Sequence, residues 1–443
     1  MPRNSETVQD PAADPGADTR LPRELWILIV GSFIVAIGMG IVSPALPTFA
    51  SSFDVGVTAA SLIVSAFAFM RLVFAPASGK LVSWFGERPI YAWGIFIVGV
   101  SSTACAFAQS YWQLLVFRGL GGTGSTMFTV SALALLVRLA PPHLRGRASS
   151  LWASSFLLGS ISGPLIGGVM IGYSLRLPFL LYGVALYLAA FVGWWMLRHS
   201  ALAAPDRGSE APEITVRQAL GHRAYRAALL SNLSKGWVVQ GVRLALVPLF
   251  VVEALRLPES MSGIALSVFA AGNAAVLIPA GRLADGRGRK PLIVAGLAVS
   301  AAGSVALGFS DSVAWLLVAS LVAGIGAGLM NPAQSAAIAD IVGAKSKGGP
   351  VLAAFQMTAD VGAILGPVVA GVLADVLSFR AAFTATGLIA VLALLLWSVA
   401  PETLVRSRGA AGEGDGSEQQ GTAAEAGFAD TSSDASRAGR GTD

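Results

Sequence analysis

The chain has 443 residues, of which 54% are hydrophobic and only 12% are charged, and its mean hydropathy is +0.69. A soluble domain carries roughly twice that share of charge, so these values exclude an ordinary soluble protein and favour a membrane protein. The net charge of +5 does not indicate a nucleic-acid partner, because the basic residues lie in short segments between apolar runs.

Twelve apolar segments are predicted in chain order. Each must be helical, because lipid offers backbone polar groups no hydrogen-bonding partner. They are residues 26–49, 58–82, 90–109, 112–137, 149–173, 177–197, 226–252, 261–284, 291–309, 313–341, 350–376 and 380–400. The fold class is therefore an all-α polytopic membrane protein with twelve transmembrane helices.

The polar stretches between and beyond these runs divide the chain. We expect a disordered cytoplasmic N-terminus (1–24), two six-helix bundles (25–198 and 226–401), a cytoplasmic linker (199–225) and a disordered cytoplasmic tail (402–443). With the N-terminus inside, 23 of the 30 Lys and Arg residues fall in cytoplasmic segments, three in outer loops and four within spans. This bias predicts that both termini are cytoplasmic, in a multi-pass protein of the plasma membrane.

One loop motif is written twice, 202 positions apart. Its shared glycines are Gly79 with Gly86 and Gly281 with Gly288, and its basic residues include Arg88 in the first copy and Arg287 and Arg289 in the second. Ser83 stands where the second copy has Asp285. We expect Asp285 and Asp340, at the end of span 10, to share Arg287 and Arg289. Position 138, equivalent to 340, is arginine, so this charge network is expected to be dismantled in the first half.

Further landmarks repeat in register. Gly122 and Gly124 of span 4 correspond to Gly324 and Gly326 of span 10, and the glycine- and proline-rich run 159–168 corresponds to 362–371. Both halves begin on the same side of the membrane, which predicts two parallel six-helix repeats.

These motifs resemble those of the major facilitator superfamily over residues 25–400. The loop motif is similar to the superfamily's signature after spans 2 and 8, and Arg118 with Gly122 and Gly124 resembles its span-4 motif. Run 159–168 resembles the span-5 antiporter motif, and the segment 44–47 resembles the twelve-helix drug:proton antiporters. The resemblance implies the major facilitator fold. It also implies a cavity lined by spans 1, 4, 7 and 10, and a contact between spans 2 and 11.

The span-5 glycines recur every fourth residue, which produces a smooth stripe for close helix packing. Direct contact with substrate is the alternative. The residues that pack or bend the helices in spans 5 and 11 are Gly159, Gly163, Pro164, Gly167, Gly366 and Pro367.

Polar groups inside spans are costly and require a role. At 100° per residue, those of span 7 fall within an arc of about 140°, and we expect this stripe to line a substrate cavity with polar groups of spans 4 and 10. The alternative is that they only join helices to one another, and for Arg118 that it bonds backbone carbonyls rather than couples protons. The candidate cavity residues are Arg118, Asn232, Lys235, Gln240, Arg243, Asn331 and Gln334.

Asp360 of span 11 and Arg71 of span 2 lie at similar depths, roughly 15 and 12 Å at 1.5 Å per residue. Because the resemblance places these spans face to face, we predict an Arg71–Asp360 ion pair between the halves. The pair is either a proton-sensitive latch or a static link.

The motifs of catalysis are absent from the sequence: it has no phosphate-binding loop and no metal-spaced set of His and Cys. We expect no enzyme activity, cofactor or metal, and a monomer whose partners are lipid, a small molecule and protons. Three functions remain open. The first is a proton-coupled exporter of drugs or small metabolites, the second an importer or facilitator for a polar or anionic metabolite, and the third a receptor or scaffold that transports nothing.

Overall fold

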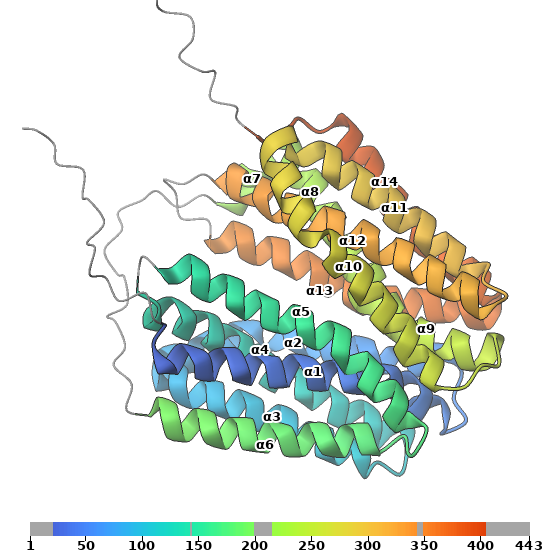
Figure 1. The fold of residues 1–443 in the computed structure, drawn as a ribbon, viewed down its shortest axis with the longest axis horizontal. Coiled ribbons are helices and arrows are strands. Elements are labelled where there is room, and N and C mark those ends of the chain that lie inside the picture. Colours follow the sequence, from blue (N-terminus) through green and yellow to red (C-terminus); the bar gives the residue numbers. More distant parts are fainter. Residues whose placement is uncertain (1–20, 142–143, 199–214, 343–348, 405–443) are drawn as a thin grey trace, which may run out of the picture. The chain divides into compact units, whose positions relative to one another are not determined.

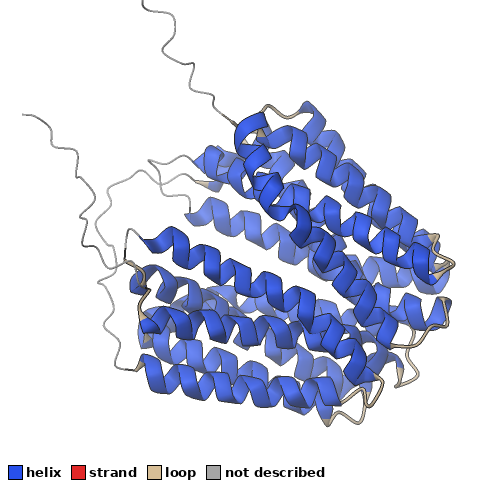
Figure 2. Cartoon of the chain, in the orientation of Figure 1, coloured by secondary structure: helices blue, strands red, loops and turns tan. Residues whose placement is uncertain are grey.

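A computed structural model describes the protein over residues 21–141, 144–198, 215–342 and 349–404. Within these ranges all regular secondary structure is helical (Figure 2). Twelve helical stretches in the described ranges are long and apolar enough to cross a membrane. The predicted twelve-helix class is therefore confirmed.

The predicted spans correspond one to one with these stretches, which extend a few residues further at most ends. In the first half they are α1 (Arg23–Ser51), α2 (Val57–Phe85), α3 (Glu87–Ala106), α4 (Tyr111–Leu139), α5 (Arg145–Ile171) and α6 (Leu177–Leu197). In the second half, span 7 is composite and is followed by α10 (Ser260–Arg287), α11 (Arg289–Gly308), α12 (Val313–Val342), α13 (Gly349–Val376) and α14 (Phe379–Val399).

The polar segments lie largely outside the described residues. The predicted disordered N-terminus is described only from residue 21, the tail only to residue 404, and the linker only from residue 215. A short helix, α7 (Val216–Leu220), begins inside the predicted linker, where the Thr215 side chain accepts from the backbone N–H of Gln218. This capping box satisfies orphan donors at the helix start.

The two halves repeat one packing scheme. In the first, α3 packs against α4 and α6, and α1 against α5; in the second, α11 packs against α12 and α14, and span 7 against α13. The halves meet along two helix pairs, α2 with α13 and α5 with α10 (Figure 1). We call the end of the helices that holds Arg23, Gly86 and Leu404 the terminal end, and the end that holds Gly56 and Ser378 the distal end.

Glycine is required at the turn that follows the second helix of each half. Gly86 (φ 83°) separates α2 from α3, and Gly288 (φ 115°) separates α10 from α11. A side chain is strained at such positive φ values, so the repeated motif conserves this turn in both copies.

Span 7 is not a continuous α-helix. It consists of α8 (Arg223–Lys235), a π-helical turn η2 (Gly236–Val242), α9 (Arg243–Leu249) and a second π-helical turn η3 (Phe250–Ala254). A Cβ built on Gly241 would lie 2.8 Å from Cδ of Pro367, so α13 approaches η2 very closely. A π-helical turn shifts the side chains that follow it around the helix axis, with consequences described below.

Candidate functional site

Two equivalent hydrogen bonds cross between the halves. Ser65 of α2 donates to the carbonyl of Ile364 on α13 over 2.7 Å, and Ser267 of α10 donates to the carbonyl of Ile161 on α5 over 2.9 Å. The serines are 202 positions apart and the isoleucines 203. The sequence repeat therefore produces a matched pair of cross-half contacts.

Among the described residues, an ion pair joins the two helices at one of these interfaces. Arg71 Nη2 on α2 lies 3.8 Å from Asp360 Oδ1 on α13, with the two side chains 26% and 14% exposed. The predicted contact is therefore present. The equivalent positions on α10 and α5 hold Asn273 and Leu157, which cannot form it.

A second acid joins the same two helices at the distal end. Asp375 of α13 accepts from the backbone N–H groups of Val57 and Thr58 over 2.9 and 2.8 Å, and from the Thr58 hydroxyl over 2.6 Å. A carboxylate at a helix start satisfies orphan donors and the helix dipole. The sequence analysis missed Asp375, because nothing local links residue 375 to residue 57; its position at the end of an apolar run was the available signal.

The interface between α5 and α10 is built from small residues instead. A Cβ built on Gly263 would lie 2.7 Å from the Cα of Gly168, so the two backbones touch. Gly172 stands where α13 has Asp375. The repeat thus gives one interface that carries charged side chains and one that is built around close glycine contacts.

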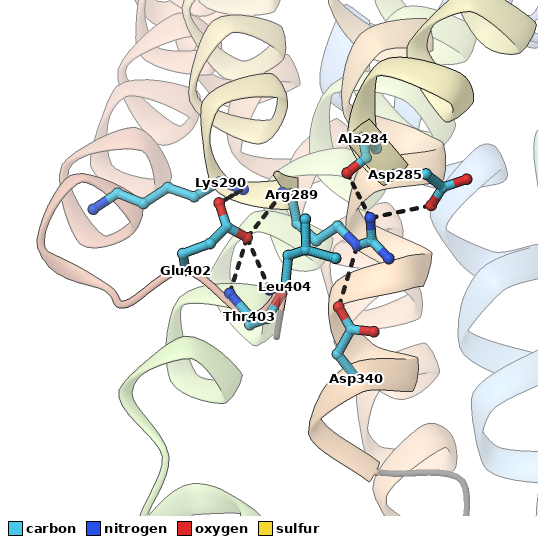
Figure 3. Close-up of polar contacts among 8 residues, drawn as sticks. All are labelled: Ala284, Asp285, Arg289, Lys290, Asp340, Glu402, Thr403 and Leu404. Carbon is cyan, nitrogen blue, oxygen red and sulfur yellow. Dashed lines mark hydrogen bonds and ion pairs between the residues drawn. The ribbon is translucent and has the colours of Figure 1, made fainter. Parts of the chain in front are cut away.

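The charge network of the second loop motif is centred on Arg289 (Figure 3). Its Nη1 lies 3.1 Å from Asp285 Oδ1 and its Nε 3.2 Å from Asp340 Oδ2. The expectation that these two acids share an arginine is confirmed. Arg287, the other arginine expected to contribute, is exposed and forms no ion pair within the described residues.

The expectation that this network is dismantled in the first half is wrong. Arg138 Nη1 lies 2.6 Å from Glu87 Oε1. Glu87 and Arg138 are each 202 positions before Arg289 and Asp340. The same ion pair therefore survives with its polarity reversed, which a search for the missing aspartate does not reveal.

Glu402 completes the network of the second half and was also missed, since the predicted tail begins there. Its carboxylate accepts from the backbone N–H groups of Arg289, Lys290, Thr403 and Leu404 over 2.9–3.1 Å (Figure 3). Partial burial acts to raise the pKa of Glu402, but these four N–H donors outweigh it and hold the pKa below its ordinary value.

Buried Arg118 and partly buried Arg243 lie over equivalent phenylalanines. The guanidinium carbon of Arg118 lies 4.1 Å from the ring centroid of Phe67, and that of Arg243 lies 4.1 Å from that of Phe269. Phe67 and Phe269 are 202 positions apart, whereas the arginines come from spans 4 and 7, which are not equivalent. A ring face stabilises a desolvated cation. Arg118 therefore rests on α2, and only Arg243 bonds a backbone carbonyl, that of Val239.

The polar groups of span 7 do not form the single stripe that was expected. Asn232 is fully buried and donates to the carbonyl of Phe355 on α13, while Arg243 lies on Phe269 of α10. The π-helical turn between them invalidates the assumed 100° per residue. Gln334 of α12 is also buried, where it donates to the Ser231 hydroxyl over 2.6 Å. Asn232 and Gln334 therefore join helices, as the alternative interpretation held.

The remaining polar candidates differ in exposure. Gln240 is exposed, whereas Lys235, Arg243 and Asn331 are partly buried. Arg118, Lys235 and Arg243 form no ion pair with an acid among the residues that the structure describes. Three cations in the membrane thus lack a protein counter-ion within that part of the chain.

The glycine stripe of α5 packs against a neighbouring helix. A Cβ on Gly159 would lie 2.7 Å from Cβ of Ala36, and one on Gly163 would lie 2.6 Å from the Cα of Gly40, both on α1. Gly167 likewise faces α1, and in the second half Gly366 packs against Trp237 of η2. The packing interpretation of these glycines is therefore supported by direct contact.

Comparison with known proteins agrees with this architecture. The sequence profile of the Major Facilitator Superfamily matches residues 28–246 and again residues 228–431. The chain belongs to the Major Facilitator Superfamily. Since this family consists of transporters, the protein is a secondary transporter and not an enzyme.

Among relatives in this superfamily, Multidrug resistance protein 1 of Bacillus subtilis (strain 168) is 26% identical over 357 residues, which cover 80% of this chain and 90% of that protein. The Quinolone resistance protein NorA of Staphylococcus aureus is 28% identical over 193 residues, 43% of this chain. The chain spans about half (49%) of the length of NorA in that match.

Solved structures show the same superfamily fold. A bacterial homolog to the human lysosomal transporter Spinster, in an inward-facing and unoccupied conformation, superposes with a TM-score of 0.73 at 17% identity, covering 84% of this chain and 95% of that one. A POT family transporter superposes with a TM-score of 0.71 at 12% identity, covering 85% and 96%.

Proposed function

We propose that the protein exports a drug-like compound or small metabolite in exchange for protons, by alternating access across the plasma membrane. The similarity to NorA and to Multidrug resistance protein 1, both named for drug resistance, supports export of such compounds. The Arg71–Asp360 contact carries the coupling part of the proposal, since it joins a titratable acid of one half to a cation of the other.

The proposed cycle uses the cross-half contacts described above. Those contacts run from the distal end, at Asp375, to the middle of α2, at Arg71, which is the fifteenth residue of its 29-residue helix. Separation of the halves at the terminal end preserves them, and separation at the distal end breaks them. With both termini in the cytoplasm, as the distribution of basic residues predicts, these contacts would close the outer end, as a state open to the cytoplasm requires.

Protonation of Asp360 would connect the proton gradient to this cycle. A protonated Asp360 no longer attracts Arg71, and an unpaired Arg71 favours an arrangement in which it reaches water. A proton taken up from outside while the distal end is open would keep Asp360 neutral, and its release to the cytoplasm would restore the contact with Arg71. The two states need differ by only a few kcal/mol for such a switch to operate.

The test is transport by the full-length protein in proteoliposomes. Efflux of fluorescent drugs is measured against an imposed pH gradient for the wild type, Asp360→Asn and the control Asp311→Asn, which changes an exposed acid outside the spans. We expect Asp360→Asn to abolish the accumulation of drug that the pH gradient drives, but to leave substrate exchange without a gradient intact. The control variant should behave as the wild type. Unchanged gradient dependence in Asp360→Asn contradicts the coupling role.

A second candidate function is import or facilitated passage of an organic anion. It is favoured by Arg118, Lys235 and Arg243, which form no ion pair with an acid in the described residues. Counterflow with paired anionic, neutral and cationic compounds separates the candidates. Saturable uptake of anions without a pH gradient favours the second function, and pH-dependent exchange of neutral or cationic compounds favours the first.

A further inference from the structure

The helices α3 and α6 pack side by side (Figure 1), and a hollow lies between them on the outside of the helix bundle. Its volume is about 480 Å³, within the usual range for ligand sites of roughly 300–1,000 Å³. Trp93, Phe191 and Trp194 at its edge are each more than half exposed. The full lining is Ala92, Trp93, Phe96, Tyr187, Ala190, Phe191 and Trp194.

The terminal end of this hollow carries two arginines. The guanidinium carbon of Arg198, just after α6, lies 4.0 Å from the ring centroid of Trp195 and 5.7 Å from that of Trp194, which lines the hollow. Arg88, in the first turn of α3, donates from Nη1 to the carbonyl of Arg198 over 3.4 Å. At 1.5 Å per residue, the four residues from Trp194 to Arg198 correspond to roughly 6 Å along the helix. Arg88 and Arg198 thus form a cationic group, here called the corner, at the terminal end of the aromatic hollow.

The second half offers an internal comparison for this corner. There Lys290, 202 positions after Arg88, donates to the carbonyls of Ser398 and Ala400 over 2.8 Å. Glu402 supplies the negative charge, and a Cβ built on Gly288 would lie 2.5 Å from its carboxylate. In the first half the position 202 before Glu402 is Ser200, and no described atom lies within 4 Å of a Cβ built on Gly86. The corner of the second half therefore receives its negative charge from the chain itself, at Glu402.

We propose that the hollow between α3 and α6 binds an anionic phospholipid, with an acyl chain along the aromatic lining and the phosphate against Arg198. The chemistry of the two ends commits to this occupant. A hydrocarbon chain fits the apolar surface, and a headgroup with net negative charge is attracted by the guanidinium groups at membrane-surface depth. A zwitterionic lipid fits the hollow but gains less at the corner.

The test measures lipid binding to the purified full-length protein by native mass spectrometry. Phosphatidylglycerol and phosphatidylcholine with identical chains are titrated against wild type, Arg198→Gln, Arg198→Lys and the control Arg23→Gln. Arg23 is exposed at the same end on α1 and does not line the hollow. We expect the wild type to prefer phosphatidylglycerol and Arg198→Gln to lose roughly fivefold of its affinity, the value of one basic residue near an anionic surface. Arg198→Lys retains the preference.

A second arm tests the hollow itself. The double variant Trp93→Ala with Phe191→Ala should weaken both lipids equally, whereas Trp112→Ala, an exposed tryptophan at the distal end, should weaken neither. The proposal is overturned if Arg23→Gln and Arg198→Gln have equal effects, if the wild type shows no preference, or if cross-linking shows a second copy of the chain seated on α3 and α6. Should the double variant not fold, the charge variants decide alone, because both change exposed side chains.

Discussion

Glu402 shows how much one carboxylate organises at the residue scale. It receives backbone N–H groups from the first turn of α11 and from the chain that leaves α14. The start of a helix attracts an anion because its first N–H groups lack partners and its dipole is positive there. Glu402 therefore holds the last described residues of the chain against the loop motif.

Replacing Glu402 by Gln tests this contribution through its pH dependence. Because the folded protein lowers the pKa of Glu402 from 4.5, its stabilisation is complete above that value and is lost as the pH falls through the lower folded value. We expect Glu402→Gln to lower the free energy of unfolding by about 1 kcal/mol at pH 7. The deficit should shrink in thermal unfolding below pH 4.5. The control Asp311→Asn should show neither effect, and a deficit that is constant with pH argues against the cap.

The reversed ion pair of the first half allows a direct exchange of charges. Glu87→Arg leaves two cations facing each other, and Arg138→Glu leaves two acids, so each single variant should lose about 2 kcal/mol of stability. The double variant restores the polarity found in the second half and should recover most of the loss. Thermal unfolding of the four proteins gives the coupling energy. Additive losses in the double variant show that the two residues do not interact.

At the residue scale, the sequence predicted those contacts whose two partners lie in one motif or at similar depths in the membrane. Arg289 and Asp285 are four residues apart on the chain, so their ion pair could be predicted from the motif. The Arg71–Asp360 ion pair could be predicted because the two residues lie at similar depths on spans that face each other. The long-range contacts of Asp375 and Glu402 were not predictable, because they are made to backbone N–H groups more than a hundred positions away, such as those of Val57 and Arg289. Backbone groups leave no mark in a sequence.

At the scale of elements, the α5 glycines permit a contact that a methyl group prevents. Gly163→Ala should lose about 1–3 kcal/mol of stability, since a Cβ would lie 2.6 Å from the Cα of Gly40 and the backbones cannot both yield. Gly79→Ala is the matched control, because no described atom lies within 4 Å of a Cβ there and alanine favours the helix. Thermal unfolding of both variants measures the difference. Equal stabilities indicate that α1 and α5 separate at little cost.

At the scale of elements, helical periodicity alone did not predict the conformation of span 7. Hydropathy located all twelve spans, because an apolar run of this length has one stable backbone conformation in lipid. It could not reveal the π-helical turn at Gly236–Val242, where one extra residue fits into the turn. The candidate cavity residues Asn232 and Arg243 were assigned to one face on the assumption of a regular helix, and they contact different helices.

At the scale of the whole molecule, duplication supplied a symmetric frame and later substitutions made it chemically asymmetric. The hydrogen bonds of Ser65 and Ser267 are equivalent in both interfaces. Asp360 and Asp375, by contrast, both lie on α13, opposite α2. We therefore expect the interface between α5 and α10 to act as an uncharged pivot, and that between α2 and α13 to respond to charge.

This asymmetry predicts that Asp375 controls opening at the distal end. Asp375→Asn removes a charged acceptor from three hydrogen bonds at the start of α2 and should shift the equilibrium toward distal opening by roughly tenfold. Spin labels at Tyr173 and Asp311, exposed residues of distal loops in opposite halves, report the separation by pulsed electron resonance, and the buried Cys105 does not interfere.

The matched control is Asp54→Asn, which makes the same chemical change at the same end, at a φ of 57° that asparagine tolerates. The fraction of molecules with the longer distance between the labels should increase in Asp375→Asn. In Asp54→Asn this fraction should equal that of the wild type. If Asp375→Asn leaves the distribution unchanged, the carboxylate only ends a helix and the charged interface does not govern access. If both variants open the distal end, the loss of any acid there suffices, and the hydrogen bonds to Val57 and Thr58 are not the cause.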